Sequence, residues 1–290
     1  MSRRLKAACI QFTAGREIGP NIERLVPLMR RAREAGADLI ALPENATMIE
    51  PIAAQSRAKA LPEEDHPAVP AFSALARETG AWILGGSLTI RLDGNKVANR
   101  SLLFDAQGDV VARYDKLHLF DVTLRNGEFY RESDNVRAGT RAVVAPTPWG
   151  LLGMTICYDM RFPQLYRALA QAGSAFLTVP SAFTRQTGAA HWHVLLRARA
   201  IETGCYVLAP AQCGVHAEGR KTYGHSLIVD PWGEVLADAG EDEGFVIAEL
   251  DTAKVEEARR MIPSLEHDRA FDGPARPTVT GKAASKPRPS

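Results

Sequence analysis

The stretch ADLIALPEN at residues 37–45 decides the fold class of this chain. Its apolar residues are typical of a short buried strand, which ends at a proline followed directly by Glu44. A second stretch, SAFLTVP at residues 174–180, repeats this pattern. Each stretch follows a helical pattern of apolar residues and a glycine, which indicates a helix that ends just before the strand. Alternating helices and buried strands predict an α/β fold.

Two further segments recur in the same order after these strands. GAWIL at residues 80–84 resembles GCYVL at 204–208, and SLLFD at 101–105 resembles SLIVD at 226–230. Each of the two aspartates is followed three residues later by glycine, which indicates a hairpin turn. Two similar halves predict two sheets of like topology, and each sheet needs cover on both faces. We therefore expect a four-layer α-β-β-α sandwich.

Two places inside these elements are ambiguous. Pro27 interrupts a helical pattern, so the helix either kinks there or begins near Val26. Gly85 and Gly86 lie inside an apolar strand pattern and indicate a bulge or a close approach of backbones. The expected strands are 7–12, 38–42, 81–90, 101–105, 110–114, 151–157, 175–180, 205–211, 226–230 and 234–237, and the expected helices are 21–35, 72–79, 163–172, 191–203 and 251–260.

Composition excludes several classes of protein. Of the 290 residues, 46% are hydrophobic and 24% are charged, with a formal net charge of +1. This balance provides no field to attract nucleic acid or an anionic membrane, and no apolar run approaches the roughly 20 residues of a membrane span. Four cysteines without a CxxC pair indicate neither a disulfide framework nor a zinc ribbon.

The ends of the chain predict its organisation and its compartment. No apolar signal segment precedes the first strand, so we expect a cytoplasmic protein. Residues 1–272 are predicted to form one domain. Residues 273–290 are rich in Pro, Lys, Ser, Arg and Ala, cannot bury enough apolar surface to fold, and are predicted to be a mobile tail.

Cys157 differs from the other cysteines because it follows an apolar strand and precedes a helix that begins with proline. A side chain at such a turn is held rigidly beside backbone N–H groups that can stabilise an oxyanion. Cys9 and Cys205 lie inside apolar strands and are predicted to be core residues, whereas Cys213 is ambiguous. The position of Cys157 alone leaves both a core role and a nucleophilic role open.

Three charged residues could complete a site with Cys157. Taken singly, Glu44 could start a helix, Lys116 could be a surface residue and Glu132 could be a solvated loop residue. Taken together they make chemical sense, because a thiol is only a few per cent ionised at neutral pH. A carboxylate can take the thiol proton during attack, and an ammonium can stabilise the oxyanion.

No metal or cofactor site is expected from the sequence. His191 and His193 face different sides of a helix and have no third ligand nearby in the sequence, and His118 and His225 are expected to be hydrogen-bonded structural residues. The sequence contains no GxSxG, GxGxxG, P-loop or HExxH motif.

Three segments resemble signatures of the nitrilase, or carbon–nitrogen hydrolase, superfamily: ALPEN at 41–45, YDKLHLFD at 114–121 and ICYDMRFP at 156–163. RES at 131–133 resembles the segment that carries the fourth active-site residue of that family. The resemblance runs from about residue 6 to residue 268 and is closest to the Nit branch. The segments of the Nit type are AHWHVLLRARAIET at 190–203, AQCG at 211–214, YGHS at 223–226 and DPWG at 230–233.

The resemblance implies an α-β-β-α sandwich that forms a homodimer or higher homo-oligomer. It implies that Cys157 is the nucleophile, Glu44 the general base, Lys116 the cationic stabiliser and Glu132 the carboxylate that holds the lysine or the substrate. The implied activity is hydrolysis of a small carboxylate-bearing amide to acid and ammonia through a thioester, with water and no cofactor. Deaminated glutathione is the first candidate substrate. An ω-amidase acting on 2-oxoglutaramate or related dicarboxylic monoamides is the alternative, followed by a nitrilase or a non-catalytic binding protein.

Four residues are predicted to bind the substrate. The backbone N–H of Tyr158 is expected to hold the oxyanion together with the lysine. Arg161 could bind a carboxylate through its guanidinium, or it could form an ion pair with Asp159 or at the surface. Ser181 and Thr184 follow the second copy of the repeated strand and are expected to line the pocket.

Overall fold

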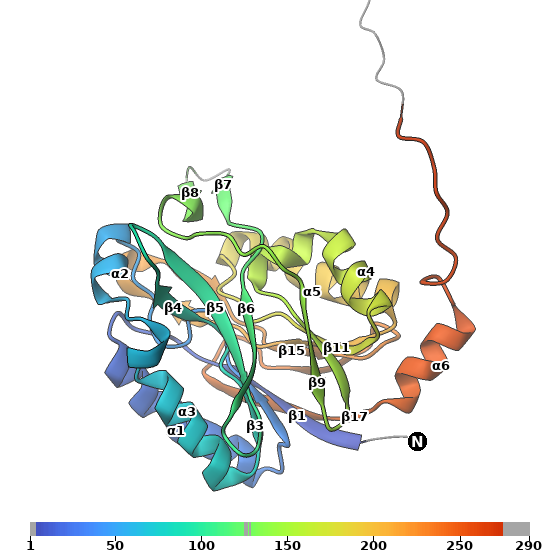
Figure 1. Ribbon diagram of the computed structural model, residues 1–290, viewed down its shortest axis with the longest axis horizontal. Helices are drawn as coiled ribbons and strands as arrows, with labels where there is room; N and C mark the ends of the chain where they lie inside the picture. The colour runs from blue at the N-terminus through green and yellow to red at the C-terminus, as the bar shows by residue number, and fades with distance from the viewer. Residues whose placement is uncertain (1–3, 125–126, 128, 275–290) are drawn as a thin grey trace, which may run out of the picture.

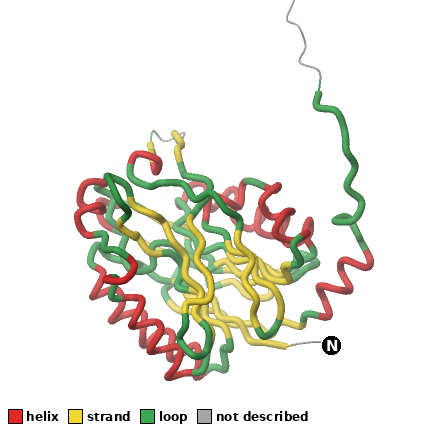
Figure 2. Tube along the Cα trace, in the orientation of Figure 1, coloured by secondary structure: helices red, strands yellow, loops and turns green. Residues whose placement is uncertain are grey.

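The computed structural model describes residues 4–124, 127 and 129–274 and has the four expected layers (Figure 1). Two sheets stack in the middle, and helices cover their outer faces, as the red and yellow segments of Figure 2 show. From residue 275 onward, the predicted tail lies outside the described residues. No helix in the described part of the chain is long and apolar enough to cross a membrane.

The first sheet is built on three parallel strands, β1 (Arg4–Gln11), β2 (Leu39–Ala41) and β3 (Trp82–Leu84). The last strand, β17 (Gly244–Asp251), pairs antiparallel with β1, so the chain closes onto its own start. The strand order is β17-β1-β2-β3-β5-β4, with β6 beside β5. The remaining strands are β4 (Leu88–Arg91), β5 (Val97–Phe104) and β6 (Val110–Asp115).

The second sheet repeats this plan, as the similar halves predict. Its parallel strands are β10 (Gly150–Met154), β11 (Ser174–Thr178) and β12 (Tyr206–Ala209). An antiparallel hairpin follows β12, just as the β5–β6 hairpin follows β3. The order is β16-β15-β12-β11-β10-β9. The remaining strands are β9 (Val143–Thr147), β15 (Leu227–Val229) and β16 (Val235–Asp238).

Helices α1 (Ile18–Glu34) and α3 (Ala68–Thr79) pack on the first sheet, and α4 (Pro163–Gln171) and α5 (Arg185–Thr203) pack on the second. The alternation of side chains along β1 separates the layers. Its odd-numbered apolar residues join the core between the sheets, and its even-numbered ones join the core under α1 and α3. The shorter elements are α2 (Ala53–Lys59), α6 (Ala253–Met261), β7 (Asp121–Thr123), β8 (Phe129–Arg131), β13 (Cys213–Val215) and β14 (Lys221–Tyr223).

Two helices begin earlier in the sequence than predicted, and the first of them continues through Pro27, as one of the two alternatives allowed. Helix α1 begins at Ile18 and contains Pro27, so the alternative start near Val26 is not the one observed. Helix α5 begins at Arg185, earlier than predicted, because the hydroxyl of Thr184 caps its first turn by accepting the Thr187 N–H at 3.4 Å.

The strand predicted at 81–90 is two strands, β3 and β4, which both pair with β5. The strand is interrupted at Gly85 and Gly86, where the backbone lies close to that of Pro43, as predicted. Gly86 has a φ of +65°, and a Cβ there would lie 2.0 Å from the carbonyl oxygen of Pro43. Only glycine fits this position, which holds the end of β2 against the neighbouring loop.

Candidate active site

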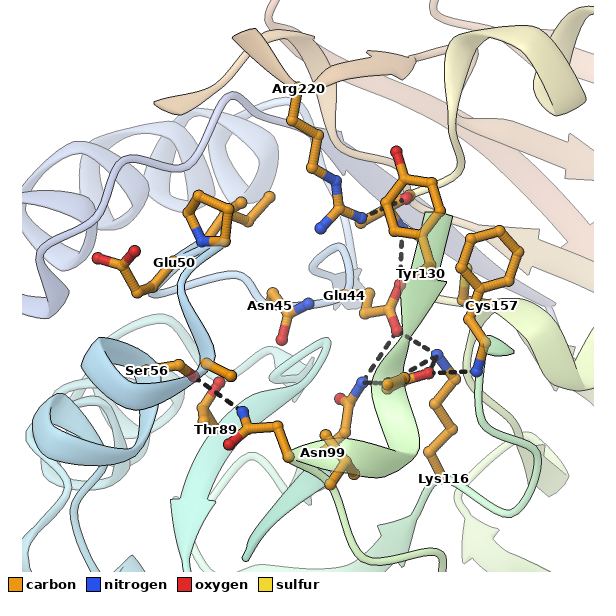
Figure 3. A pocket seen from close by; sticks show the side chains of 18 of the residues that line it. Glu44, Asn45, Glu50, Ser56, Thr89, Asn99, Lys116, Tyr130, Cys157 and Arg220 are labelled. Atoms are coloured by element: carbon orange, nitrogen blue, oxygen red, sulfur yellow. Dashed lines mark hydrogen bonds and ion pairs between the residues drawn. The ribbon is translucent and has the colours of Figure 1, made fainter. Parts of the chain in front are cut away.

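Figure 3 shows Glu44, Lys116 and Cys157 around one pocket, and each of the three follows the end of a strand of one of the two large sheets. Glu44 comes after β2 and Cys157 after β10, so each lies beyond the carboxyl end of a parallel strand. Lys116 follows β6, and Glu132 begins a short 3₁₀ turn after β8. The layered fold brings these four side chains to one cavity, which all of them line.

Cys157 occupies a strained turn at the start of a 3₁₀ segment, Cys157–Arg161. Its φ is +49°, a left-handed conformation that side chains other than glycine rarely adopt. Its N–H donates to the carbonyl of Pro180 at 2.9 Å, which ties the turn to the end of β11. The thiol is buried and lines the same cavity as Glu44, close enough for the charge of that carboxylate to act on it. The backbone therefore holds the sulfur beside the carboxylate.

Asp159 fixes this turn from inside the protein. Its Oδ2 accepts the Ile156 N–H at 2.9 Å and the Tyr114 hydroxyl at 2.6 Å, and its Oδ1 accepts the His118 N–H at 3.0 Å. The His118 ring also lies 2.7 Å from Oδ1, which agrees with the structural role expected for that histidine. Asp159 is fully buried and positions the turn that carries Cys157.

Lys116 joins the two carboxylates of the site. Its Nζ donates to Glu44 Oε1 at 2.7 Å and to the Glu132 oxygens at 2.9 and 3.1 Å. Glu132 is itself held by the N–H of Phe120 at 2.7 Å. The lysine side chain is only 2% exposed, so water competes little with these interactions.

The charges fix the resting protonation of the site. Burial opposes ionisation of Glu44, but the adjacent Lys116 ammonium outweighs it and holds the pKa of that carboxyl below its usual value. Burial likewise disfavours the charged lysine, yet Glu132 and Glu44 raise the pKa of Lys116 well above its usual value. Burial, together with the charge of Glu44, raises the pKa of the Cys157 thiol. The resting site therefore contains a carboxylate, an ammonium and a neutral thiol.

Three residues that the sequence did not single out support Glu44. Asn99 donates from Nδ2 to Glu44 Oε1 at 2.9 Å, and the N–H of Ala182 donates to Oε2 at 2.8 Å. The Gln212 side chain donates to the backbone carbonyl of Glu44 at 3.0 Å. No motif marks Asn99 or Ala182, and Gln212 lies in the AQCG segment without any predicted role, because each residue is brought to Glu44 only by packing of segments distant in the sequence.

The cavity has a volume of about 250 Å³ and contains only part of the predicted binding set. Thr184 lines it, whereas Tyr158, Arg161 and Ser181 are absent from its lining. The Ser181 side chain is buried and donates to the carbonyl of Val179 at 2.9 Å. The other lining residues include Asn45, Met48, Ile49, Glu50, Ser56, Thr89, Asn99, Phe120, Phe129, Tyr130, Arg131, Asn135, Phe183 and Arg220.

Arg161 lies behind the cavity wall. Its Nη2 is 3.2 Å from His191 Nδ1, and its guanidinium stacks 5.2 Å from the ring centre of Phe183 and 5.9 Å from that of Tyr158. The suggested ion pair with Asp159 does not form, because that carboxylate is already bonded within its own turn and to His118. Arg161 therefore supports the aromatic wall from outside.

A second polar cluster lies away from this cavity, at the end of the second sheet. His193 Nε2 is 3.0 Å from Asp238 Oδ2, and His225 Nδ1 is 2.9 Å from Asp238 Oδ1. The three ligand-type atoms lie within 4.8 Å of one another. The sequence offered His193 no third ligand-type residue nearby, but the fold brings His225 and Asp238 to it from distant segments. His225 has the hydrogen-bonded role expected for it.

Comparisons with known proteins agree with this geometry. Residues 6–260 match the carbon-nitrogen hydrolase family. A Synechocystis protein named deaminated glutathione amidase is 42% identical over 269 residues, which cover 90% of this chain and 97% of the relative.

Two solved structures share the fold. The NitFhit protein of C. elegans is 38% identical with a TM-score of 0.86; the match covers 92% of this chain and 65% of that longer protein. An amidase from Nesterenkonia sp. AN1, solved after addition of acrylamide at its active-site cysteine, is 25% identical with a TM-score of 0.75 and is matched over 89% of this chain and 98% of that one. The chain belongs to the carbon-nitrogen hydrolase family.

Proposed function

We propose that this chain is a cysteine-dependent amidase that hydrolyses a small carboxylate-bearing amide through a thioester on Cys157. The observation that carries the proposal is that a buried thiol shares one cavity with a carboxylate that binds a buried ammonium at 2.7 Å. The name of the Synechocystis relative makes deaminated glutathione the first candidate substrate.

Acylation begins with the thiol neutral and Glu44 ionised. Glu44 takes the thiol proton as sulfur attacks the amide carbonyl, because the raised thiol pKa leaves almost no free thiolate. Negative charge develops on the carbonyl oxygen, and the Lys116 ammonium, which lines the cavity, stabilises it. Glu44 then gives its proton to the departing nitrogen. The amine leaves, ammonia in the simplest case, and a thioester remains.

Deacylation reuses the same groups with water as the nucleophile. Glu44 takes a proton from water as the water oxygen attacks the thioester carbonyl. Glu44 then returns this proton to the sulfur as the acid departs. Throughout both steps Glu132 keeps Lys116 charged and in place through its two contacts of 2.9 and 3.1 Å. No cofactor is needed for this chemistry.

Amine release from deaminated glutathione tests the proposal. We expect the Cys157→Ala variant to lose turnover to background and to keep its thermal stability, because the change removes one buried atom. Cys213→Ala is the matched control, since that thiol is also buried but does not line the cavity. Normal turnover by Cys157→Ala would refute the proposal. Comparing kcat/KM for deaminated glutathione, 2-oxoglutaramate and a simple nitrile separates the amidase from the ω-amidase and nitrilase alternatives.

We also propose that the chain forms a homo-oligomer and is located in the cytoplasm. Exposed apolar side chains at Ile201, Trp232, Met261 and Ile262 supply surface for self-association, which light scattering can measure. All four cysteines are free thiols, which agrees with a reducing compartment.

A further inference from the structure

We propose that Arg220 is the residue that binds the carboxylate on the acyl chain of the substrate and so determines the preference for anionic amides over neutral ones. The inference rests on the proposed amidase function and specifies its substrate class. Arg220 lies on the turn between β13 and β14 and enters the cavity from the side opposite Lys116 (Figure 3).

The guanidinium of Arg220 is incompletely satisfied. Its Nη2 donates to the carbonyl of Ala182 at 3.1 Å, and the group lies 5.8 Å from the ring centre of Tyr130. Its Nε is buried and has no hydrogen-bond partner. Because the guanidinium makes one hydrogen bond to the described residues, through Nη2, it keeps donors for a ligand in the cavity that brings acceptors. A carboxylate does so with two oxygens and the opposite charge.

No protein carboxylate in the described part of the chain forms an ion pair with Arg220, because the nearby acidic residues form ion pairs with other cations. Glu218, on the same turn, pairs with Arg16 at 3.0 Å. Glu50, which lines the cavity, pairs with Arg16 at 2.7 Å and with Lys59 at 3.0 Å. The positive charge of Arg220 therefore remains available to an anionic ligand.

The other cations near the cavity are less suited to this role. Lys116 is held between the two carboxylates of the catalytic set. Arg131 is exposed at the rim, where its guanidinium packs 5.1 Å from the Phe129 ring centre and its charge acts on Asp121. Arg161 does not line the cavity. Among the described residues, Arg220 is thus the cavity cation that is both without an ion-pair partner and withdrawn from the exposed rim where Arg131 lies.

Ala182 sets the spacing between Arg220 and the reacting group. Its carbonyl accepts from Arg220 at 3.1 Å, and its N–H donates to Glu44 Oε2 at 2.8 Å. One backbone residue thus separates the guanidinium from the proposed general base. A carboxylate on Arg220 and a carbonyl at Cys157 can belong to one short acyl chain, which a cavity of about 250 Å³ can hold.

Two amides that differ only in charge test the inference: the monoamide of glutaric acid and its methyl ester. For Arg220→Met we expect kcat/KM to fall about 100-fold more for the anionic amide than for the ester, mainly through KM. Arg220→Lys keeps a point charge but loses the planar fork, so its selectivity should lie between Arg220→Met and wild type. Arg161→Lys is the matched control, and its ratio of kcat/KM for the anionic amide to kcat/KM for the ester should equal that of the wild type.

Each outcome decides a different point. Equal losses on both amides would show that Arg220 only supports the Ala182–Glu44 contact, which would overturn the inference. A wild-type enzyme that hydrolyses both amides equally well, with turnover dependent on Cys157, would overturn it too and leave the amidase proposal intact. Wild-type protein without Cys157-dependent hydrolysis of any amide tested would instead refute the proposed function.

Discussion

At the residue scale, the arrangement around Lys116 explains how a neutral thiol and a charged lysine coexist. Two carboxylates surround one ammonium in a buried place, so the three groups carry one excess negative charge. That charge disfavours a free thiolate and favours a neutral thiol beside Glu44. Attack must therefore be coupled to proton transfer, which is the role we propose for Glu44.

Replacing Glu132 with Gln tests the role of the second carboxylate. The amide keeps the shape but removes the negative charge that contributes most to the raised pKa of Lys116. We expect kcat to fall about 100-fold while the folded structure persists. The control is Asp134→Asn, on the same turn but exposed, which should keep wild-type kcat. An unchanged kcat for Glu132→Gln would show that Glu44 alone is enough to keep Lys116 charged and in position.

Sequence motifs could predict Glu44, Lys116 and Cys157, but not Asn99 and Arg220, which line the same cavity. Glu44, Lys116 and Cys157 lie in motifs that resemble family signatures. Their residue types also suit one reaction, because a thiol nucleophile needs a base and a cation. Asn99 and Arg220 lie in segments without a motif, and their roles arise from contacts across the fold. Arg161 follows Cys157 in the sequence, yet the 3₁₀ turn carries it behind Phe183.

At the element scale, the ends of strands determine where the reactive groups lie. The loop after β2 is fixed by the contact between Gly86 and Pro43, and the turn after β10 is fixed by Asp159. Strand patterns predicted β2 and most of β10 because these strands are buried on both faces. The β13–β14 hairpin was not predicted, because three-residue strands carry too few residues to show an alternation.

The contact at Gly86 predicts a large effect of one added methyl group. In Gly86→Ala the Cβ would meet the Pro43 carbonyl, so the loop carrying Glu44 must move. We expect about 3 kcal/mol of destabilisation and a loss of activity. Gly94→Ala is the matched control, because Gly94 has a φ of +84° but open space around it. It should cost only about 1 kcal/mol, the cost of the backbone conformation alone. Equal urea midpoints for the two variants would contradict the account of this loop.

At the scale of the whole molecule, four buried thiols predict instability at alkaline pH. Burial raises the pKa of Cys9, Cys157, Cys205 and Cys213 in the folded state. Above about pH 8.5 the unfolded chain therefore releases protons that the folded chain keeps, and stability falls as pH rises. Each thiol contributes a loss of up to about 1.4 kcal/mol per pH unit in this range.

Urea unfolding under reducing conditions at about pH 7 and about pH 9 measures this effect. The free energy of unfolding should fall at the higher pH, and the fall should be smaller in a Cys9→Ala, Cys205→Ala double variant. The same loss in wild type and double variant would show that other groups cause it.

The central claim is that the acyl group of the substrate is transferred to Cys157. Acid quenching during turnover of a carboxylate-bearing amide, followed by digestion and mass spectrometry, measures this directly. The account predicts that the peptide containing Cys157 gains the mass of the acyl group and that the amine is already released. An acyl group on a different residue, or steady amine release by protein whose Cys157 has been blocked by alkylation, would contradict it.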